Sequence, residues 1–171
     1  MAQFAKEANK AAQALSTTTN TYAKAALIYY QQGLNDKQVK ERTDLTIKMA
    51  NVTGDTAKTV SEQLTAIWNN FDDGSRSLES YIDVITALGA STASSTREIA
   101  EGLEKFAAIA RTVGLSYEYA TSALATVVAK TRQSADVVGT AFKTLFARIQ
   151  DLELGKTLDD GTTLGTYSQA L

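Results

Sequence analysis

The 171-residue sequence contains no cysteine, no histidine and no proline. Without cysteine and histidine, it lacks a thiol nucleophile, a Ser-His or Cys-His pair and a histidine ligand for a metal ion. Most hydrolase mechanisms are thereby excluded, and we expect no enzyme activity, no cofactor and no metal site. Average usage would give roughly eight prolines in a chain of this length, so their absence leaves long uninterrupted helices unopposed.

Strong charge of one sign and long apolar runs are also missing. The formal net charge is −2, which argues against a surface that neutralises nucleic-acid phosphates. No apolar run reaches the length of a membrane-spanning helix, and the run at 25–30 is too short for the core of a signal peptide. With 44% hydrophobic residues, the composition is that of one soluble globular unit. We therefore expect no specific nucleic-acid binding and no membrane insertion by this chain.

What is present is a strong helical pattern. Apolar residues recur at steps of three and four in five segments, which begin at Thr56, Ser77, Thr96, Tyr117 and Val138. The pattern predicts an all-α fold of about six or seven amphipathic helices in helical hairpins or a bundle, with no sheet. The large apolar residues expected to form its structural core are Leu64, Trp68, Phe71, Leu103, Phe106, Leu124, Phe142, Leu145, Phe146 and Ile149.

Glycines punctuate this pattern. In four places a glycine is followed, after one residue, by a short polar residue that can cap the next helix. The glycines expected to stop helices are Gly33, Gly54, Gly89 and Gly114, and the capping residues are Asn35, Thr56, Ser91 and Ser116. Because these glycines stand at clearly unequal intervals, their spacing indicates repeated helical hairpins without a counted period.

Composition divides the chain into three parts. Residues 1–32 form an alanine-rich N-terminal helical segment with a hinge near 16–21, where short hydroxyl and amide side chains compete with the backbone for hydrogen bonds. Residues 33–154 form the helical core. Residues 155–171 are expected to form a C-terminal turn and the start of a truncated helix, which suggests a fragment of a longer protein.

Two kinds of ligand-binding motif are present only in part. The letters GKT at 155–157 resemble the end of a P-loop, but Gln150 stands where the first glycine is required. DDGS at 72–75 and DDGT at 159–162 lack the spacing of a calcium-binding EF-hand loop, so Asp-Gly turns are expected instead.

A pair of carboxylates remains the one route to catalysis that the composition leaves open. Glycoside hydrolysis needs only two carboxyl groups at a fixed separation. Glu98, Glu101 and Glu104 lie at three-residue steps on one predicted helix, with Arg97 and Lys105 beside them. An exposed charged strip is the favoured interpretation.

Charge is placed unevenly along the chain. Residues 54–90 contain six acidic residues against Lys58 and Arg76, whereas residues 33–53 lean basic. Solvated helix faces explain this pattern, and electrostatic matching between subunits placed head to tail is the alternative.

Several segments resemble the core region of tail tape measure proteins from tailed bacteriophages and prophages of Gram-positive hosts. The segments are TALGA at 86–90, REIAEGLEKFA at 97–107, GLSYEYA at 114–120, LATV at 124–127, TRQS at 131–134 and VGTAFKTLFARIQ at 138–150. The resemblance covers the chain from about residue 25 onward. The motifs are structural, and the cell-wall hydrolase modules and apolar membrane-active segments of that family are not represented.

The resemblance implies a length-setting rod around which the tail tube polymerises. The implied partners are the tail tube protein, the tail assembly chaperones and the distal tail protein, and a homo-oligomer is compatible with the pattern. The implied location is the virion tail, and the host cytoplasm during assembly. The helices would pack on one another in isolation and rearrange when threaded into the tube. The alternative is a cytoplasmic helical scaffolding or signalling module that binds a partner helix, and a cell-wall enzyme ranks third.

Overall fold

The structure, a computed structural model, describes residues 2–151, with side chains from residue 5 to residue 149. These residues form eight α-helices and no strand. The predicted all-α fold is confirmed, with one helix more than the largest number expected. The helices are α1 (Ala2–Ala14), α2 (Thr19–Gln31), α3 (Asp36–Thr53), α4 (Ala57–Phe71), α5 (Leu78–Ser91), α6 (Thr96–Thr112), α7 (Tyr117–Thr131) and α8 (Ala135–Asp151).

Short polar side chains begin the helices. In each case a side-chain oxygen accepts a hydrogen bond from the backbone N–H three residues later, which satisfies one of the free donors of the first turn. The capping residues are Thr18, Asn35, Thr56, Ser77, Ser95 and Ser116. At Asn35 and Ser95 the bond is reciprocal, because the side chains of Gln38 and Glu98 accept from the backbone N–H of the cap.

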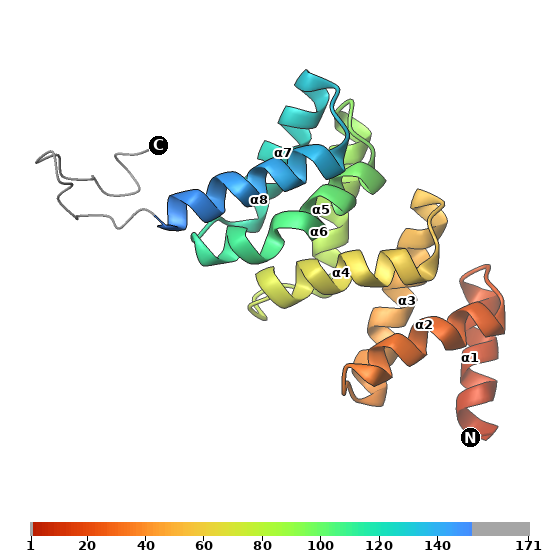
Figure 1. Ribbon diagram of the computed structural model, residues 1–171. Helices are drawn as coiled ribbons and strands as arrows, with labels where there is room; N and C mark the ends of the chain where they lie inside the picture. The colour runs from red at the N-terminus through yellow and green to blue at the C-terminus, as the bar shows by residue number, and fades with distance from the viewer. Residues whose placement is uncertain (1, 152–171) are drawn as a thin grey trace, which may run out of the picture.

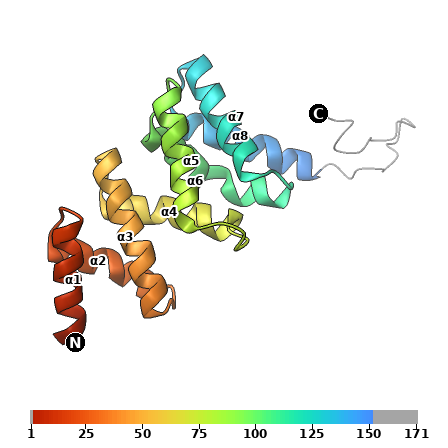
Figure 2. The ribbon, with the colours of Figure 1, turned by 180° about the vertical axis from the view of Figure 1, so that it is seen from behind.

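The helices are arranged in two layers. In one layer α2, α4, α6 and α8 pack against one another in that order, and in the other α3, α5 and α7 do the same. Each helix also packs on its neighbours in the sequence. The chain therefore advances from α1 at one end of the molecule to α8 at the other (Figures 1 and 2). Consecutive helical hairpins are stacked, as in α-solenoid architectures.

The stack has a regular period, which the helix caps reveal. The capping hydroxyls of α2, α4 and α6 belong to Thr18, Thr56 and Ser95, which follow one another at almost equal intervals. Ser134 stands at the next step of this series and accepts a hydrogen bond from the backbone N–H of Val137 in the first turn of α8. The unequal glycine intervals do not show this period. The prediction that the helical hairpins repeat without a regular period is therefore wrong.

Two clusters of buried apolar side chains hold the stack together. The larger one extends from α2 to α8 and includes Tyr29, Trp68 and Phe106. The smaller one joins α1, α2 and α3 and is made mostly of alanine. Because α2 contributes to both clusters, the alanine-rich N-terminal segment is packed continuously onto the rest of the stack.

The chain turns sharply between the first two helices. α1 ends at Ala14, Ser16 has a positive φ of 54°, and α2 begins at Thr19. The interruption therefore occupies only the first part of the expected hinge region at 16–21.

The turn predicted at 155–171 and the motifs at 155–157 and 159–162 lie outside the described residues. Within residues 2–151, no helix combines the length and the hydropathy needed to cross a bilayer.

Candidate functional site

A very close helix–helix contact lies where α8 crosses α6. A Cβ atom built on Gly139 would lie 2.5 Å from the carbonyl oxygen of Gly102, and one built on Gly102 would lie 2.6 Å from a methyl group of Leu124. A real side-chain carbon does not approach other atoms so closely. Glycine at position 139 therefore lets the backbones of α6 and α8 meet, and glycine at position 102 leaves room for Leu124 of α7.

Three phenylalanines extend this crossing along the helices. Phe106 of α6 contacts Phe142 and Phe146 of α8, with ring centroids 5.2 and 6.1 Å apart. Both separations are within the range of favourable aromatic pairs. Lys105 and Asp136 form an ion pair of 3.1 Å across the same two helices. This ion pair is exposed, so the glycine contact and the aromatic rings provide most of the attraction.

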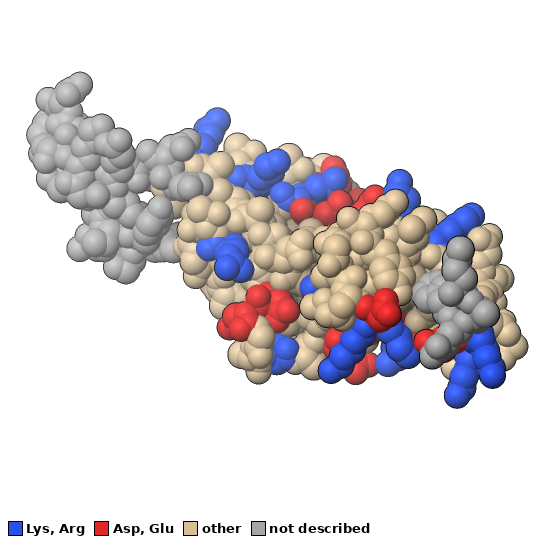
Figure 3. Space-filling view, turned by 90° about the horizontal axis from the view of Figure 1, so that it is seen from below, with Lys and Arg blue, Asp and Glu red and all other residues tan. Residues whose placement is uncertain are grey.

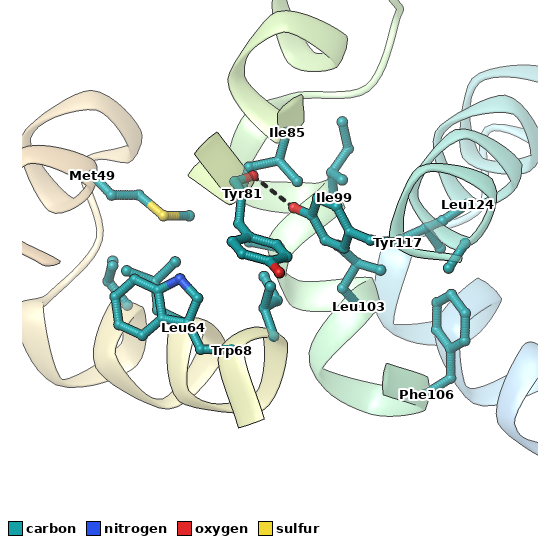
Figure 4. Close-up of a cluster of buried hydrophobic side chains, with 14 of the residues drawn as sticks. Met49, Leu64, Trp68, Tyr81, Ile85, Ile99, Leu103, Phe106, Tyr117 and Leu124 are labelled. Atoms are coloured by element: carbon teal, nitrogen blue, oxygen red, sulfur yellow. Dashed lines mark hydrogen bonds between the residues drawn. The ribbon is translucent and has the colours of Figure 1, made fainter. Parts of the chain in front are cut away.

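A second set of aromatic side chains joins α4, α5 and α7 (Figure 4). The hydroxyl of Tyr117 donates a hydrogen bond of 2.6 Å to the carbonyl oxygen of Tyr81, and the hydroxyl of Tyr81 donates one of 2.9 Å to the carbonyl oxygen of Phe71. The indole N–H of Trp68 donates to the carbonyl oxygen of Leu78 at 3.2 Å. Each polar group of these buried rings thus has a partner, which fixes how the helices sit on one another.

One arginine covers this aromatic set at the surface. The guanidinium of Arg76 lies 4.6 Å from the ring centre of Tyr81 and 5.5 Å from that of Tyr117. It also pairs with Glu118 at 2.6 Å, and this hydrogen bond lowers the pKa of the Glu118 carboxyl group. Arg76 therefore links the loop before α5 to the first turn of α7 by cation–π and ionic contacts.

The structure places most of the expected core residues inside. The buried ones are Leu64, Trp68, Leu103, Phe106, Leu124 and Phe146, and the partly buried ones are Phe71, Phe142 and Ile149. Leu145 is 50% exposed. The prediction that it belongs to the core is wrong, because its side of α8 has no helix packed against it within the described residues.

The expected helix-stop glycines have two different roles. Gly33, Gly54 and Gly114 have φ angles of 79°, 75° and 78°, in the left-handed region that favours glycine after a helix. Gly89 instead lies inside α5, which continues to Ser91, so the prediction that it stops a helix is wrong. A Cβ atom there would lie 2.5 Å from the backbone nitrogen of Thr96, so Gly89 is needed for close packing against the start of α6.

Of the three carboxylates considered for catalysis, Glu98 has a structural role, as do the two aspartates considered for calcium at 72–73. Glu98 accepts hydrogen bonds from the backbone and side chain of Ser95, which lower the pKa of its carboxyl group. Asp72 and Asp73 accept from the backbone N–H groups two residues further on, as in Asx turns. No group of three or more carboxylates with the spacing of a metal site occurs in the described part of the chain.

An open pocket of about 430 Å³, lined by polar and apolar groups alike, lies between the start of α2, the end of α3 and the start of α4. It is lined by Thr17, Thr21, Ile47, Ala50, Asn51, Gly54, Asp55, Thr56 and Ala57. Its single carboxylate, Asp55, is paired with Arg97 at 3.2 Å. One carboxylate that is already neutralised is too few for a calcium or magnesium site, and the lining suits water.

Oppositely charged residues from different parts of the chain meet at the surface. Lys48, from the basic span, pairs with Glu79, from the acidic span, at 2.9 Å. On the face shown in Figure 3, basic and acidic side chains lie next to one another. The uneven charge along the sequence is thus partly matched within one chain, through the packing of α3 against α5.

Sequence reasoning missed the glycine pair Gly102 and Gly139 as an interface. Both are internal to helices, where glycine is normally unfavourable, and this position was the feature that could have indicated a close helix contact.

Comparison with known families matches residues 5–166 to the family described as phage-related minor tail protein. No curated protein and no solved structure shows significant similarity to the chain.

Proposed function

The chain belongs to the phage-related minor tail protein family, and from this premise we propose that it is part of the tape measure that sets the length of the tail inside the tail tube. Family membership supports a structural role in a phage tail. The resemblance of its motifs to tape measure proteins of phages from Gram-positive hosts supports the finer assignment.

The observation that carries the proposal is the one-dimensional organisation of the helices. Each helix of the α2, α4, α6 and α8 layer packs on the next, and the same kind of cap recurs at regular intervals, at Thr18, Thr56 and Ser95. In such an array each repeat contacts only its neighbours, so length is additive in the number of repeats. A ruler needs this proportionality between residue number and physical length.

The stack and an extended rod can be two states of the same repeats. A straight α-helix advances about 1.5 Å per residue, so one repeat, such as 56–94, would measure roughly 60 Å when fully extended. In the stack, the same repeat advances by one helix spacing of about 8–10 Å. We propose that the chain is stacked before assembly and extended within the tube.

The remaining parts of the proposal follow from this role. The chain acts through its shape and its helix surfaces and has no catalytic function. Its partners are the tail tube protein, the tail assembly chaperones and the distal tail protein. It resides in the virion tail and, during assembly, in the host cytoplasm.

The test is an in-frame duplication of residues 56–94 in the phage, because this segment runs from one cap to the residue before the next. Electron microscopy should show tails longer by roughly 60 Å. Deletion of the same segment should shorten the tail by a similar amount. Tails of unchanged length in viable phages carrying either change would contradict the ruler. Tyr119→Ala, an exposed substitution in α7 that leaves the residue number unchanged, is the control and should not alter tail length.

A further inference from the structure

The common period makes residues of the four even-numbered helices directly comparable. Counted from the capping residue, the seventh and eleventh positions face the next helix of the layer: Gly102 and Phe106 of α6 contact Gly139 and Phe146 of α8. The fifth and twelfth positions, which are Gly139 and Phe146 in α8, face the preceding helix. We call these two sides the forward face and the backward face.

Within the described residues, these forward positions are buried on α2, α4 and α6 and exposed on α8. The seventh position is held by Ala25, Gln63, Gly102 and Ala141, and the eleventh by Tyr29, Ile67, Phe106 and Leu145. In α2, α4 and α6 all six of these residues are buried. In α8, Ala141 is exposed and Leu145 is 50% exposed. Val137, one turn before Ala141, is 51% exposed and extends the same apolar stripe.

The backward face shows the opposite pattern. The fifth position is held by Ala23, Ser61, Ala100 and Gly139, and the twelfth by Tyr30, Trp68, Ala107 and Phe146. All are buried except those of α2, which are half-buried. Between them on α2, Leu27 is 54% exposed. The residue at the same position of α4 is Thr65, whose hydroxyl accepts a hydrogen bond from the side chain of Gln32, the residue that follows α2.

The two exposed faces thus match the two sides of the contact between α6 and α8, and the rings of Tyr29 and Trp68, with centroids 6.4 Å apart, repeat part of it between α2 and α4. We propose that α8 of one copy receives α2 of a second copy, so that chains stack head to tail. Leu145, Ala141 and Val137 of the first copy would pack against Leu27 and Ala23 of the second. The helices α8 and α2 lie toward opposite ends of the stack (Figure 1), so one copy can use both at once.

The chemistry of the two faces suits such a contact. The three stripe residues of α8 and both residues of α2 are apolar and uncharged, so no ionised group has to be buried between them. A contact of this kind is heterologous and does not close on itself, which gives open linear assemblies. Because two helices bury less area than a standard protein–protein interface, the association should be weak and dependent on concentration.

The test uses two substitutions, each of which places a charged side chain on one of the two faces. The wild-type chain is studied by sedimentation velocity between about 0.01 and 1 mM, and its average mass should rise with concentration. Leu145→Arg removes the forward face and Leu27→Arg the backward face, so each variant alone should remain monomeric. An equimolar mixture still offers one intact pair of faces and should form particles of two chains and no larger ones.

Controls make the result decisive. Val52→Arg changes an apolar residue of α3 that is 64% exposed and lies outside both faces, so this variant should assemble like the wild type. Circular dichroism should show the same melting temperature for all variants. A wild-type chain that is monomeric throughout would overturn the proposal, whether or not Leu145→Arg lowers its melting temperature. Self-association of Leu27→Arg alone would also overturn it, because this would reveal a symmetric contact between two α8 helices.

Discussion

The carbonyl oxygen of Gly102 in α6 lies so close to Gly139 in α8 that a Cβ atom on Gly139 would be only 2.5 Å away from it. The obstacle is backbone, which cannot turn aside as a flexible side chain would. The crossing of α6 and α8 is therefore a point of the stack with little tolerance for added volume.

Gly139→Ala should destabilise the fold although alanine is the better helix former. Overpacking at the crossing costs about 1–3 kcal/mol, and the gain in helix propensity returns at most about 1 kcal/mol. Urea denaturation should therefore show a lower free energy of unfolding. Thr140→Ala, at the adjacent exposed position, adds no atom to the crossing and should leave the stability unchanged or slightly raised. Equal behaviour of the two variants would contradict the close contact.

Phe106→Ala and Leu145→Ala should have very different effects on stability. Phe106 is 1% exposed and contacts two phenylalanines of α8, so its truncation should cost about 3–5 kcal/mol. Leu145 is half exposed, and its truncation should change the stability by no more than about 0.5 kcal/mol in dilute solution. Thermal unfolding followed by circular dichroism measures both. A large loss for Leu145→Ala would show that its side of α8 is covered.

Ser95→Ala should weaken the start of α6 and change how stability responds to acid. Loss of the cap should cost about 1 kcal/mol at neutral pH. The pKa of Glu98 is lowered by hydrogen bonds from the backbone N–H and the hydroxyl of Ser95, and the variant lacks only the second. The contribution of these bonds is present above the unfolded pKa of about 4.5 and is lost as the pH falls below it. Ser95→Ala should therefore lose less stability than the wild type between neutral pH and the acid range. Parallel curves of unfolding free energy against pH would contradict this.

Alkaline pH should unfold the protein through its buried tyrosines. Burial raises the pKa of Tyr29 to about 12, and it also raises those of Tyr22 and Tyr117. Since the folded state holds these protons more tightly, the stability they contribute is complete below about pH 10, the unfolded value, and is lost as the pH rises toward 12. Urea denaturation between pH 8 and 12 should show this decline. In Tyr29→Phe the decline should be shallower, and a curve parallel to that of the wild type would refute the assignment.

The class of fold and many local details could be predicted from the sequence. Apolar spacing identified the stripes around Leu64, Leu103 and Leu124, because a helix that buries one face repeats its apolar residues every three to four positions. The reciprocal cap formed by Asn35 and Gln38 is also readable, since it depends only on residues three apart.

Other features depend on which helix packs where, and this is not encoded in local spacing. Leu145 is as apolar as its counterparts at the same register, but it is exposed because no described helix covers it. Gly102 and Gly139 gain their meaning only from each other. Gly89 resembles a helix stop, yet Ser95 is the true cap of α6. The period is carried by the residues that cap the even-numbered helices and not by the glycines.

The central claim is that one repeat, from the cap of an even-numbered helix to the residue before the next such cap, is a unit of length. Small-angle X-ray scattering of the purified chain tests it most directly. In a variant with residues 56–94 duplicated, the maximum dimension should increase by about 8–10 Å, the spacing of one helix layer, while the radius of gyration of the cross-section stays the same. An unchanged maximum dimension with a thicker cross-section would mean that the added hairpin packs on the side of the stack, and would contradict the account.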